Sequence, residues 1–268
     1  MVSRLLVKAN PQGREIVNVT PERAGWTHVG FRALRLAADE TQTLNTARRE
    51  LCVVVLTGTV DVSVDGTPYN KLGQRNSVFD PVSPAALYVG AGCEVAIRAV
   101  RNAEVALCSA PAGKTPRATR LIDRASMRRT VRGKGSNTRY VCDILPHDDP
   151  TADHLLVVEV ITPAGHASSY PPHKHDMETP PVETQLEETY YHRLNPPQGF
   201  AFQRVYTDDR SIDEACAVED HDVVMVPRGY HPVVAPHGYD LYYLNVMAGP
   251  NRFWVFRNDP AHEWMLNT

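Results

Sequence analysis

The sequence predicts an all-β protein made of two related barrel domains. Runs of strand length recur along the 268 residues, among them ELCVVVLTG (50–58), TVDVSVDG (59–66), DVVMVPRG (222–229) and DLYYLNVMAG (240–249). Apolar and polar residues alternate in VDVSV, which is typical of a strand with one buried face. The 21 prolines and 16 glycines interrupt the chain too often for long helices. Many short strands separated by turns favour a β-sandwich or barrel in each half.

The two halves share an order of features, which indicates a diverged internal repeat. Each half has an acidic residue at the start of an apolar strand, Glu50 in ELCVVV and Glu188 in ETYYHRL, and later a strand that ends at a proline and a short turn. The turn residues of NPPQG (195–199) are typical of the tip of a hairpin. We therefore expect two domains related by duplication, residues 1–115 and 116–268.

The composition restricts the range of functions. A net charge of −3 predicts no general attraction to nucleic acid or membranes. The basic residues between Lys114 and Lys134 are spread singly without interleaved aromatics, as in a solvated connecting segment. No apolar run approaches the roughly 18–20 residues of a membrane span, and MVSRLLVKAN lacks the apolar core of a signal peptide. The five cysteines have no CxxC spacing, so we expect reduced thiols and a cytoplasmic protein.

Two histidines in SSYPPHKHD (168–176) indicate a metal site. In an extended strand alternate side chains share a face, so His173 and His175 should lie about 6–7 Å apart on one face. Lys174 should point away, and we do not expect it to be a catalytic base. Glu188 and His231, the latter after the turn PRGY, could complete a set of three nitrogens and one carboxylate oxygen. That set suits zinc, manganese, iron, cobalt or nickel.

This pattern resembles the two motifs of the cupin superfamily, in which His-x-His and Glu come from the first motif and one His from the second. The resemblance implies a bicupin, with two jelly-roll β-barrels. The N-terminal copy is degenerate, because LNTARRE (44–50) has no His-x-His and Ala85 stands where the last histidine would fall. The segment between His175 and the acid is unusually long, so the carboxylate ligand could instead be one of three other residues: Glu187, Glu183 or Glu178.

The long motifs between residues 168 and 252 are similar to those of the 5-deoxy-glucuronate isomerases of myo-inositol catabolism, which are related to the 4-deoxy-L-threo-5-hexosulose-uronate ketol-isomerases. The resemblance implies an aldose–ketose isomerase that converts 5-deoxy-D-glucuronate to 5-dehydro-2-deoxy-D-gluconate with one divalent metal ion. We expect zinc, because the reaction involves no redox change, while manganese, iron, cobalt and nickel fit the same ligands.

An isomerase of this kind needs a base that moves a proton between adjacent carbons. Strand alternation from Glu188 places Tyr190 and His192 on the same face. His192 is our first candidate for the base, with Tyr190 beside it in the catalytic group. A barrel-wall role is the alternative for both side chains.

The expected sugar-acid substrate carries a carboxylate, for which the fork of an arginine is a suited partner. Arg204 is the best candidate, although the strand register decides whether Arg204 or Gln203 points inward. Tyr206 and Tyr243 could donate hydrogen bonds to sugar oxygens or line the barrel wall.

Two other functions would use the same features. An Fe(II) cupin dioxygenase with the same ligands would require O₂ and a redox-active metal, whereas an isomerase should work anaerobically with zinc. A non-catalytic sugar-binding bicupin would be expected to lose its ligands in both halves, and here only the first half has lost them. The exposed strand edges of barrel domains favour pairing between copies, so we expect a homo-oligomer.

Overall fold

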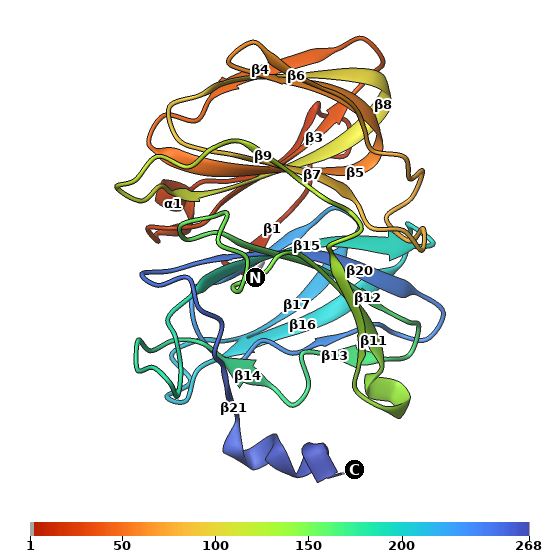
Figure 1. The fold of residues 1–268 in the computed structure, drawn as a ribbon. Coiled ribbons are helices and arrows are strands. Elements are labelled where there is room, and N and C mark those ends of the chain that lie inside the picture. The colour runs from red at the N-terminus through yellow and green to blue at the C-terminus, as the bar shows by residue number, and fades with distance from the viewer. Residues whose placement is uncertain (1–2, 268) are drawn as a thin grey trace. The chain divides into compact units, whose positions relative to one another are not determined.

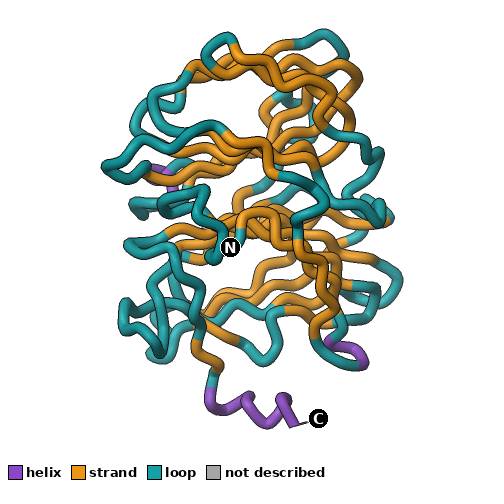
Figure 2. Tube along the Cα trace, in the orientation of Figure 1, coloured by secondary structure: helices purple, strands orange, loops and turns teal. Residues whose placement is uncertain are grey.

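The computed structural model describes residues 3–267, and sheets dominate it (Figures 1 and 2). The helices are short: α1 (Pro21–Ala24), η1 (Gly135–Asn137) and η2 (Pro260–Asn267). The prediction of an all-β protein is confirmed. In this part of the chain, every helix is too short or too polar to cross a membrane.

The N-terminal half forms one antiparallel sheet. Its strands are β2 (Glu15–Val19), β3 (Gly30–Leu36), β4 (Thr41–Asn45), β5 (Arg49–Val64), β6 (Thr67–Leu72), β7 (Ala85–Val89), β8 (Glu94–Pro111) and β9 (Arg120–Ile122). They are ordered β2-β3-β8-β5-β7-β9, while β4 pairs with β8 and β6 pairs with β5. The long strands β5 and β8 pair with each other from end to end and therefore connect the other strands.

Burial along β5 follows the sequence pattern. Leu51 to Leu56 is continuously buried, and beyond it every second residue is buried, as the alternation in VDVSV predicted. The buried residues of β5 pack with those of β3, β7 and β8, among them Leu34, Leu87 and Ile97. Burial of this apolar face, at about 25 cal/mol per Å², is the main term that stabilises the sheet.

The C-terminal half contributes most strands of the remaining sheets. The strands are β1 (Leu6–Val7), β10 (Arg128–Arg132), β11 (Arg139–Leu145), β12 (Leu156–Thr162), β13 (Ala167–Ser168), β14 (His173–Lys174), β15 (Glu187–Asn195), β16 (Phe200–Tyr206), β17 (Asp213–Glu219), β18 (Val223–Val226), β19 (Val233–Val234), β20 (Asp240–Ala248) and β21 (Arg257–Asn258). One sheet has the order β1-β18-β15-β20-β12-β11-β10, a second has the order β13-β19-β16-β17, and β14 pairs with β21.

The turn at NPPQG differs from the prediction. The chain does reverse there, with the Gly199 amide donating to the Pro196 carbonyl at 3.0 Å. However, β15 before the turn and β16 after it belong to different sheets, so they do not form a hairpin. Turn residues specify a change of direction, whereas burial of the apolar faces decides which strand becomes the partner.

The chain forms two compact units that exchange segments. The N-terminal unit comprises Asn10–Arg128 and Cys142–Val158, and the C-terminal unit comprises the remaining segments. A single boundary between residues 115 and 116 was expected, whereas each unit also contains a segment from the other side of that boundary. For example, β1 pairs with β18, so a segment from the start of the chain belongs to the C-terminal unit.

A buried carboxylate ties the segment 142–158 into the N-terminal unit. Glu50 is completely buried at the start of β5. Its carboxylate accepts hydrogen bonds from the Tyr88 hydroxyl and from the backbone amides of Asp153, His154 and Leu155, each at 2.7 Å. Four donors compensate for the loss of water around the charge, which would otherwise be very costly.

We predict that Glu50→Gln lowers the free energy of unfolding of the N-terminal unit by about 3 kcal/mol, because the new amide group turns N–H donors toward the backbone amides. Tyr88→Phe removes a single hydrogen bond and should cost about 1 kcal/mol. Urea denaturation followed by circular dichroism measures both values. Equal losses in the two variants would contradict the central role of the carboxylate.

Candidate metal and substrate site

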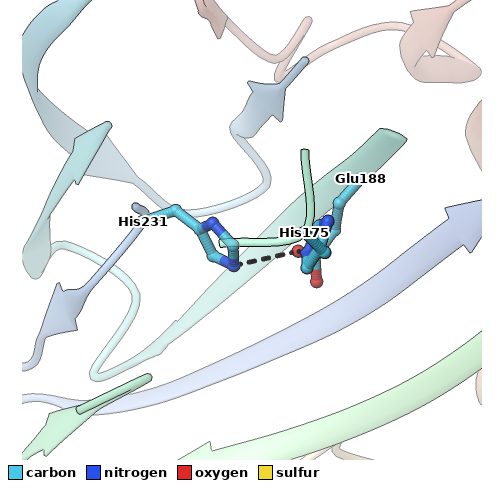
Figure 3. Close-up of side chains that lie close together, drawn as sticks. All are labelled: His175, Glu188 and His231. Atoms are coloured by element: carbon cyan, nitrogen blue, oxygen red, sulfur yellow. Dashed lines mark hydrogen bonds and ion pairs between the residues drawn. The ribbon is translucent and has the colours of Figure 1, made fainter. Parts of the chain in front are cut away.

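Three buried side chains of the C-terminal unit converge on one point (Figure 3). His175 follows β14, Glu188 is the second residue of β15, and His231 follows β18. One ligand atom from each lies within 4.8 Å of the others. Nε2 of His175 lies 3.1 Å from Oε2 of Glu188, and Nε2 of His231 lies 3.2 Å from the same oxygen.

Backbone carbonyls fix the orientation of both imidazoles. Nδ1 of His175 lies 2.9 Å from the carbonyl oxygen of Leu186, and Nδ1 of His231 lies 2.8 Å from that of Gly229. Because a carbonyl can only accept, each Nδ1 carries a proton and donates it. In the neutral ring, Nε2 then presents a lone pair toward Glu188.

This arrangement brings together atoms that all accept hydrogen bonds. Two imidazole lone pairs and a carboxylate repel one another unless a proton or a cation lies between them. Nε2 of His231 is buried and has no aligned hydrogen-bond donor or acceptor in the described chain. The donor set of imidazole nitrogens and a carboxylate oxygen therefore fits a divalent transition-metal ion.

The electrostatics show that the cluster attracts positive charge, either a proton or a cation. Burial alone would raise the pKa of Glu188, but the contacts with His175 and His231 outweigh it and lower this pKa to about 2. Burial would lower the pKa of His175, and the adjacent Glu188 outweighs that effect and raises it. The carboxylate is thus ionised at neutral pH and is able to hold a cation.

His173 lies beside this cluster. Its ring centroid is 6.4 Å from that of His175, within the spacing expected from an extended strand, and 4.8 Å from that of His231. Burial and the two neighbouring imidazoles lower the pKa of His173 well below its usual value, which favours the neutral form that binds metals. His173 is the nearest candidate for a fourth ligand.

The acid in the cluster is Glu188, and the three alternatives lie elsewhere. Glu187 is the preceding residue of β15 and projects to the opposite face. Glu183 accepts hydrogen bonds from the backbone amides of Asp176 and Met177, and Glu178 accepts from Gln185 and Asn251.

The turn before His231 depends on a glycine. Gly229 has a φ of 97°, a left-handed conformation that favours glycine, and a Cβ atom there would lie 2.6 Å from the Tyr206 carbonyl oxygen. Its amide donates to the Asp176 carboxylate at 2.7 Å. This hydrogen bond joins the segment that carries His175 to the turn that carries His231.

Lys174 points away from the cluster, as expected from strand alternation. Its ammonium group contacts the carboxylate of Asp208 and lies 5.3 Å from the centre of the Tyr230 ring. The side chain is buried in these contacts, so it is not available to the atoms around Glu188.

The inward face of β15 continues the site beyond the cluster. Glu188, Tyr190 and His192 alternate along the strand, and Tyr190 pairs with Asn245 of β20 while His192 pairs with Tyr243. The Tyr190 ring lies 5.7 Å from that of His231 and 5.0 Å from that of Tyr243, measured between centroids. The hydroxyls of Tyr190 and Tyr243 contact Ser169 and Ser168 respectively.

Several buried polar atoms, on this face of β15 and on strands β16 and β20, have no hydrogen-bond partner among the described residues. They are both ring nitrogens of His192, the side-chain carbonyl oxygen of Gln203 and that of Asn245. Burial lowers the pKa of His192 to about 4, so the ring is neutral at pH 7. Buried polar groups are rarely left unsatisfied without a functional reason, and this group is arranged to receive a polar ligand. Asn245 was missed in the sequence, although alternation from Tyr243 would have found it.

The register of β16 separates the remaining candidates. Gln203 is buried, whereas Arg204 is on the exposed face and forms a two-point ion pair with Asp213, at 2.8 and 2.9 Å. Tyr206 shares that face, with the Arg204 guanidinium 4.4 Å from the centre of its ring, and its hydroxyl donates to Asp259. The structure therefore brings Gln203 to the site but not Arg204 or Tyr206, because adjacent residues of a strand face opposite sides.

Comparisons with known proteins agree with these features. Residues 5–265 match the model of the KduI/IolB family. A 5-deoxy-glucuronate isomerase of Geobacillus kaustophilus is 49% identical, across all of this chain and 97% of the relative. One of Bacillus subtilis (strain 168) is 48% identical, with 96% of this chain and 97% of the relative covered.

Solved structures extend the comparison to the fold. An IolB-like protein from Salmonella typhimurium LT2 superposes with a TM-score of 0.95 at 47% identity, covering 98% of this chain and 99% of the other. Oxalate decarboxylase of Lactobacillus farciminis has a TM-score of 0.65 at 13% identity, covering 100% and 91%, which confirms the bicupin fold. On the strength of the family match and these relatives, the chain belongs to the KduI/IolB family.

Proposed function

We propose that this chain is a metal-dependent isomerase that converts 5-deoxy-D-glucuronate to 5-dehydro-2-deoxy-D-gluconate. The observation that carries the proposal is the convergence of two imidazole nitrogens on the Glu188 carboxylate, next to a face of unsatisfied polar groups. Relatives at 48–49% identity that bear the name 5-deoxy-glucuronate isomerase support the choice of substrate. We expect the enzyme to act in the cytoplasm. We also expect it to form a homo-oligomer, whose molar mass light scattering would measure.

His175, Glu188 and His231 would hold the metal ion, with His173 as the fourth ligand. When bound, a divalent ion supplies Lewis-acid stabilisation of the negative charge that develops on the substrate carbonyl oxygen. Zinc is our first choice, since the reaction has no redox step, and manganese, iron, cobalt and nickel suit the same ligand set.

We expect His192 to be the base that moves the proton. An unpartnered nitrogen of the neutral ring accepts the proton from the hydroxyl-bearing carbon next to the aldehyde and returns it to the former aldehyde carbon. The proton of that hydroxyl moves to the former aldehyde oxygen, so the hydroxyl becomes the ketone, the aldehyde becomes an alcohol, and the atoms balance. Burial raises the pKa of Tyr243, which keeps its hydroxyl protonated as a hydrogen-bond donor to a sugar oxygen. The Tyr190 ring contacts the rings of both Tyr243 and His231, and its hydroxyl can also donate a hydrogen bond to a sugar oxygen.

The amides of Gln203 and Asn245 complete the polar lining. Each has a buried carbonyl oxygen without a partner in residues 3–267, which is suited to accept from sugar hydroxyls. Satisfying these atoms only in the complex would favour a polyhydroxylated ligand over an apolar one.

We predict that the purified protein contains about one divalent ion per chain and turns over 5-deoxy-D-glucuronate without oxygen. His175→Ala removes one ligand and should lower both metal content and turnover at least tenfold. The exposed His237 gives a matched control, since His237→Ala should change neither. Metal analysis by mass spectrometry and anaerobic turnover followed by NMR measure the two quantities.

Other outcomes of that experiment support other functions. Metal content without isomerisation, together with oxygen consumption, would favour a dioxygenase. Absence of metal after reconstitution would favour a sugar-binding bicupin without catalysis.

We predict that His192→Ala lowers kcat by a factor of about 100 to 10,000, the usual contribution of a positioned general base. Because His192 lies outside the metal cluster, the variant should retain its metal ion. Steady-state kinetics and metal analysis of the same preparation check this expectation. Turnover within threefold of wild type would assign the proton transfer to another group.

A further inference from the structure

The carboxylate of the proposed substrate needs a cation, and the partner expected from the sequence does not provide it. The guanidinium of Arg204 is already paired with both oxygens of the Asp213 carboxylate on the exposed face of β16. A second arginine of the C-terminal unit, Arg139, lies at the start of β11.

Arg139 is half-buried and has only neutral hydrogen-bond partners in the described chain. Its Nη1 donates to the backbone carbonyl and to the side-chain oxygen of Asn137, at 3.1 and 3.2 Å. No carboxylate of residues 3–267 forms an ion pair with it. A guanidinium is always charged and has five N–H donors in a planar fork, so Arg139 has donors left for a ligand.

Hydrogen bonds connect Arg139 to the site. Asn137, which accepts from Arg139, donates to the backbone carbonyl of Tyr170 at 3.2 Å, and the preceding residue, Ser169, contacts the Tyr190 hydroxyl. Burial lowers the pKa of this guanidinium, and Tyr243 and Tyr190 are among the groups whose charge affects it. Tyr243 is affected in turn. Burial raises the pKa of its hydroxyl, and the charge of Arg139 lowers this pKa by a smaller amount. These are the two tyrosines that line the inward face next to His192 and His231.

A cavity of about 470 Å³ gives a ligand access to Arg139. Lys134, Tyr170 and Trp264 line it together with Arg139, which makes it cationic with aromatic walls. Two further lining residues connect it to the site along the chain. Ala167 precedes Ser168, which contacts the Tyr243 hydroxyl, and Pro171 lies two residues before His173.

The shape of the substrate decides how far from the reacting end its carboxylate must bind. In an open-chain six-carbon uronate the aldehyde and the carboxylate are at opposite ends, roughly 6 Å apart when the chain is extended. The reacting end belongs at the Glu188 cluster, so the carboxylate must lie one sugar length away. The cavity volume lies within the usual range of roughly 300–1,000 Å³ for small-molecule sites.

We propose that Arg139 binds the carboxylate of the substrate and selects sugar acids over neutral sugars. This inference rests on the proposed function. The guanidinium fork pairs with the two carboxylate oxygens, and this contact replaces water around a cation that the protein leaves without an acid. Arg139 is a specificity-determining residue, because it acts on the unreactive end of the substrate.

The test compares two substrates in wild type and variants. One substrate is 5-deoxy-D-glucuronate, and the other is 5-deoxy-D-glucose, in which a hydroxymethyl group replaces the carboxylate. Wild type should prefer the acid in kcat/KM, and Arg139→Gln should reduce that preference about 10- to 100-fold, mainly through KM. Arg139→Lys keeps the charge without the fork and should retain part of the preference. Arg132→Gln serves as the matched control. It removes a nearby charge that lies over the Trp254 ring, and it should leave the preference for the acid unchanged.

Metal content, measured in the same samples, should be unchanged in all variants. An unchanged preference in an active Arg139→Gln enzyme would overturn the assignment, and so would an equal loss on both substrates. If Arg139→Gln does not fold, a full preference for the acid in Arg139→Lys would overturn it. Failure of the proposed function is distinct, because wild type itself would then not turn over 5-deoxy-D-glucuronate.

Discussion

The close approach of the Glu188 carboxylate to two imidazole nitrogens is the constraint on which the C-terminal unit depends. Left alone, these acceptors would repel one another, so the surrounding backbone must hold them in place. Strand β15 lies between β18 and β20, which fixes Glu188. The carbonyls of Leu186 and Gly229 fix the two rings, and the Asp176–Gly229 hydrogen bond joins their segments.

The N-terminal unit shows the opposite solution for a carboxylate in the same strand position. Glu50 is the second residue of β5, as Glu188 is of β15. Around Glu50 all four close partners are hydrogen-bond donors from the protein, whereas around Glu188 the partners are ring nitrogens whose protons face elsewhere. The Glu50 carboxylate is fully hydrogen-bonded by the protein, whereas the Glu188 carboxylate is suited to bind a cation. The difference lies in the partners rather than in the acid.

Strand alternation explains how much of the site could be predicted from the sequence. The period of two placed Tyr190 and His192 on the face of Glu188 and turned Lys174 away, because these relations are local to one strand. The choice between Gln203 and Arg204 needed the register of β16 against its neighbours, which no local pattern contains. The prediction that NPPQG joins two strands of one hairpin was wrong for the same reason. Arg139 lies far from the histidine motifs in sequence, so only the folded chain relates it to Tyr243.

The hydrogen bonds of Glu50 have a consequence for dividing this protein into parts. Three of its four donors come from residues 153–155, whereas Glu50 itself and the fourth donor, Tyr88, belong to the segment Asn10–Arg128. A gene fragment ending at residue 115 would encode a barrel with a buried carboxylate and one remaining donor, the Tyr88 hydroxyl. The complementary fragment would expose backbone amides that have lost their acceptor. The two repeats, although related by sequence pattern, are therefore no longer separable at the boundary where duplication would have joined them.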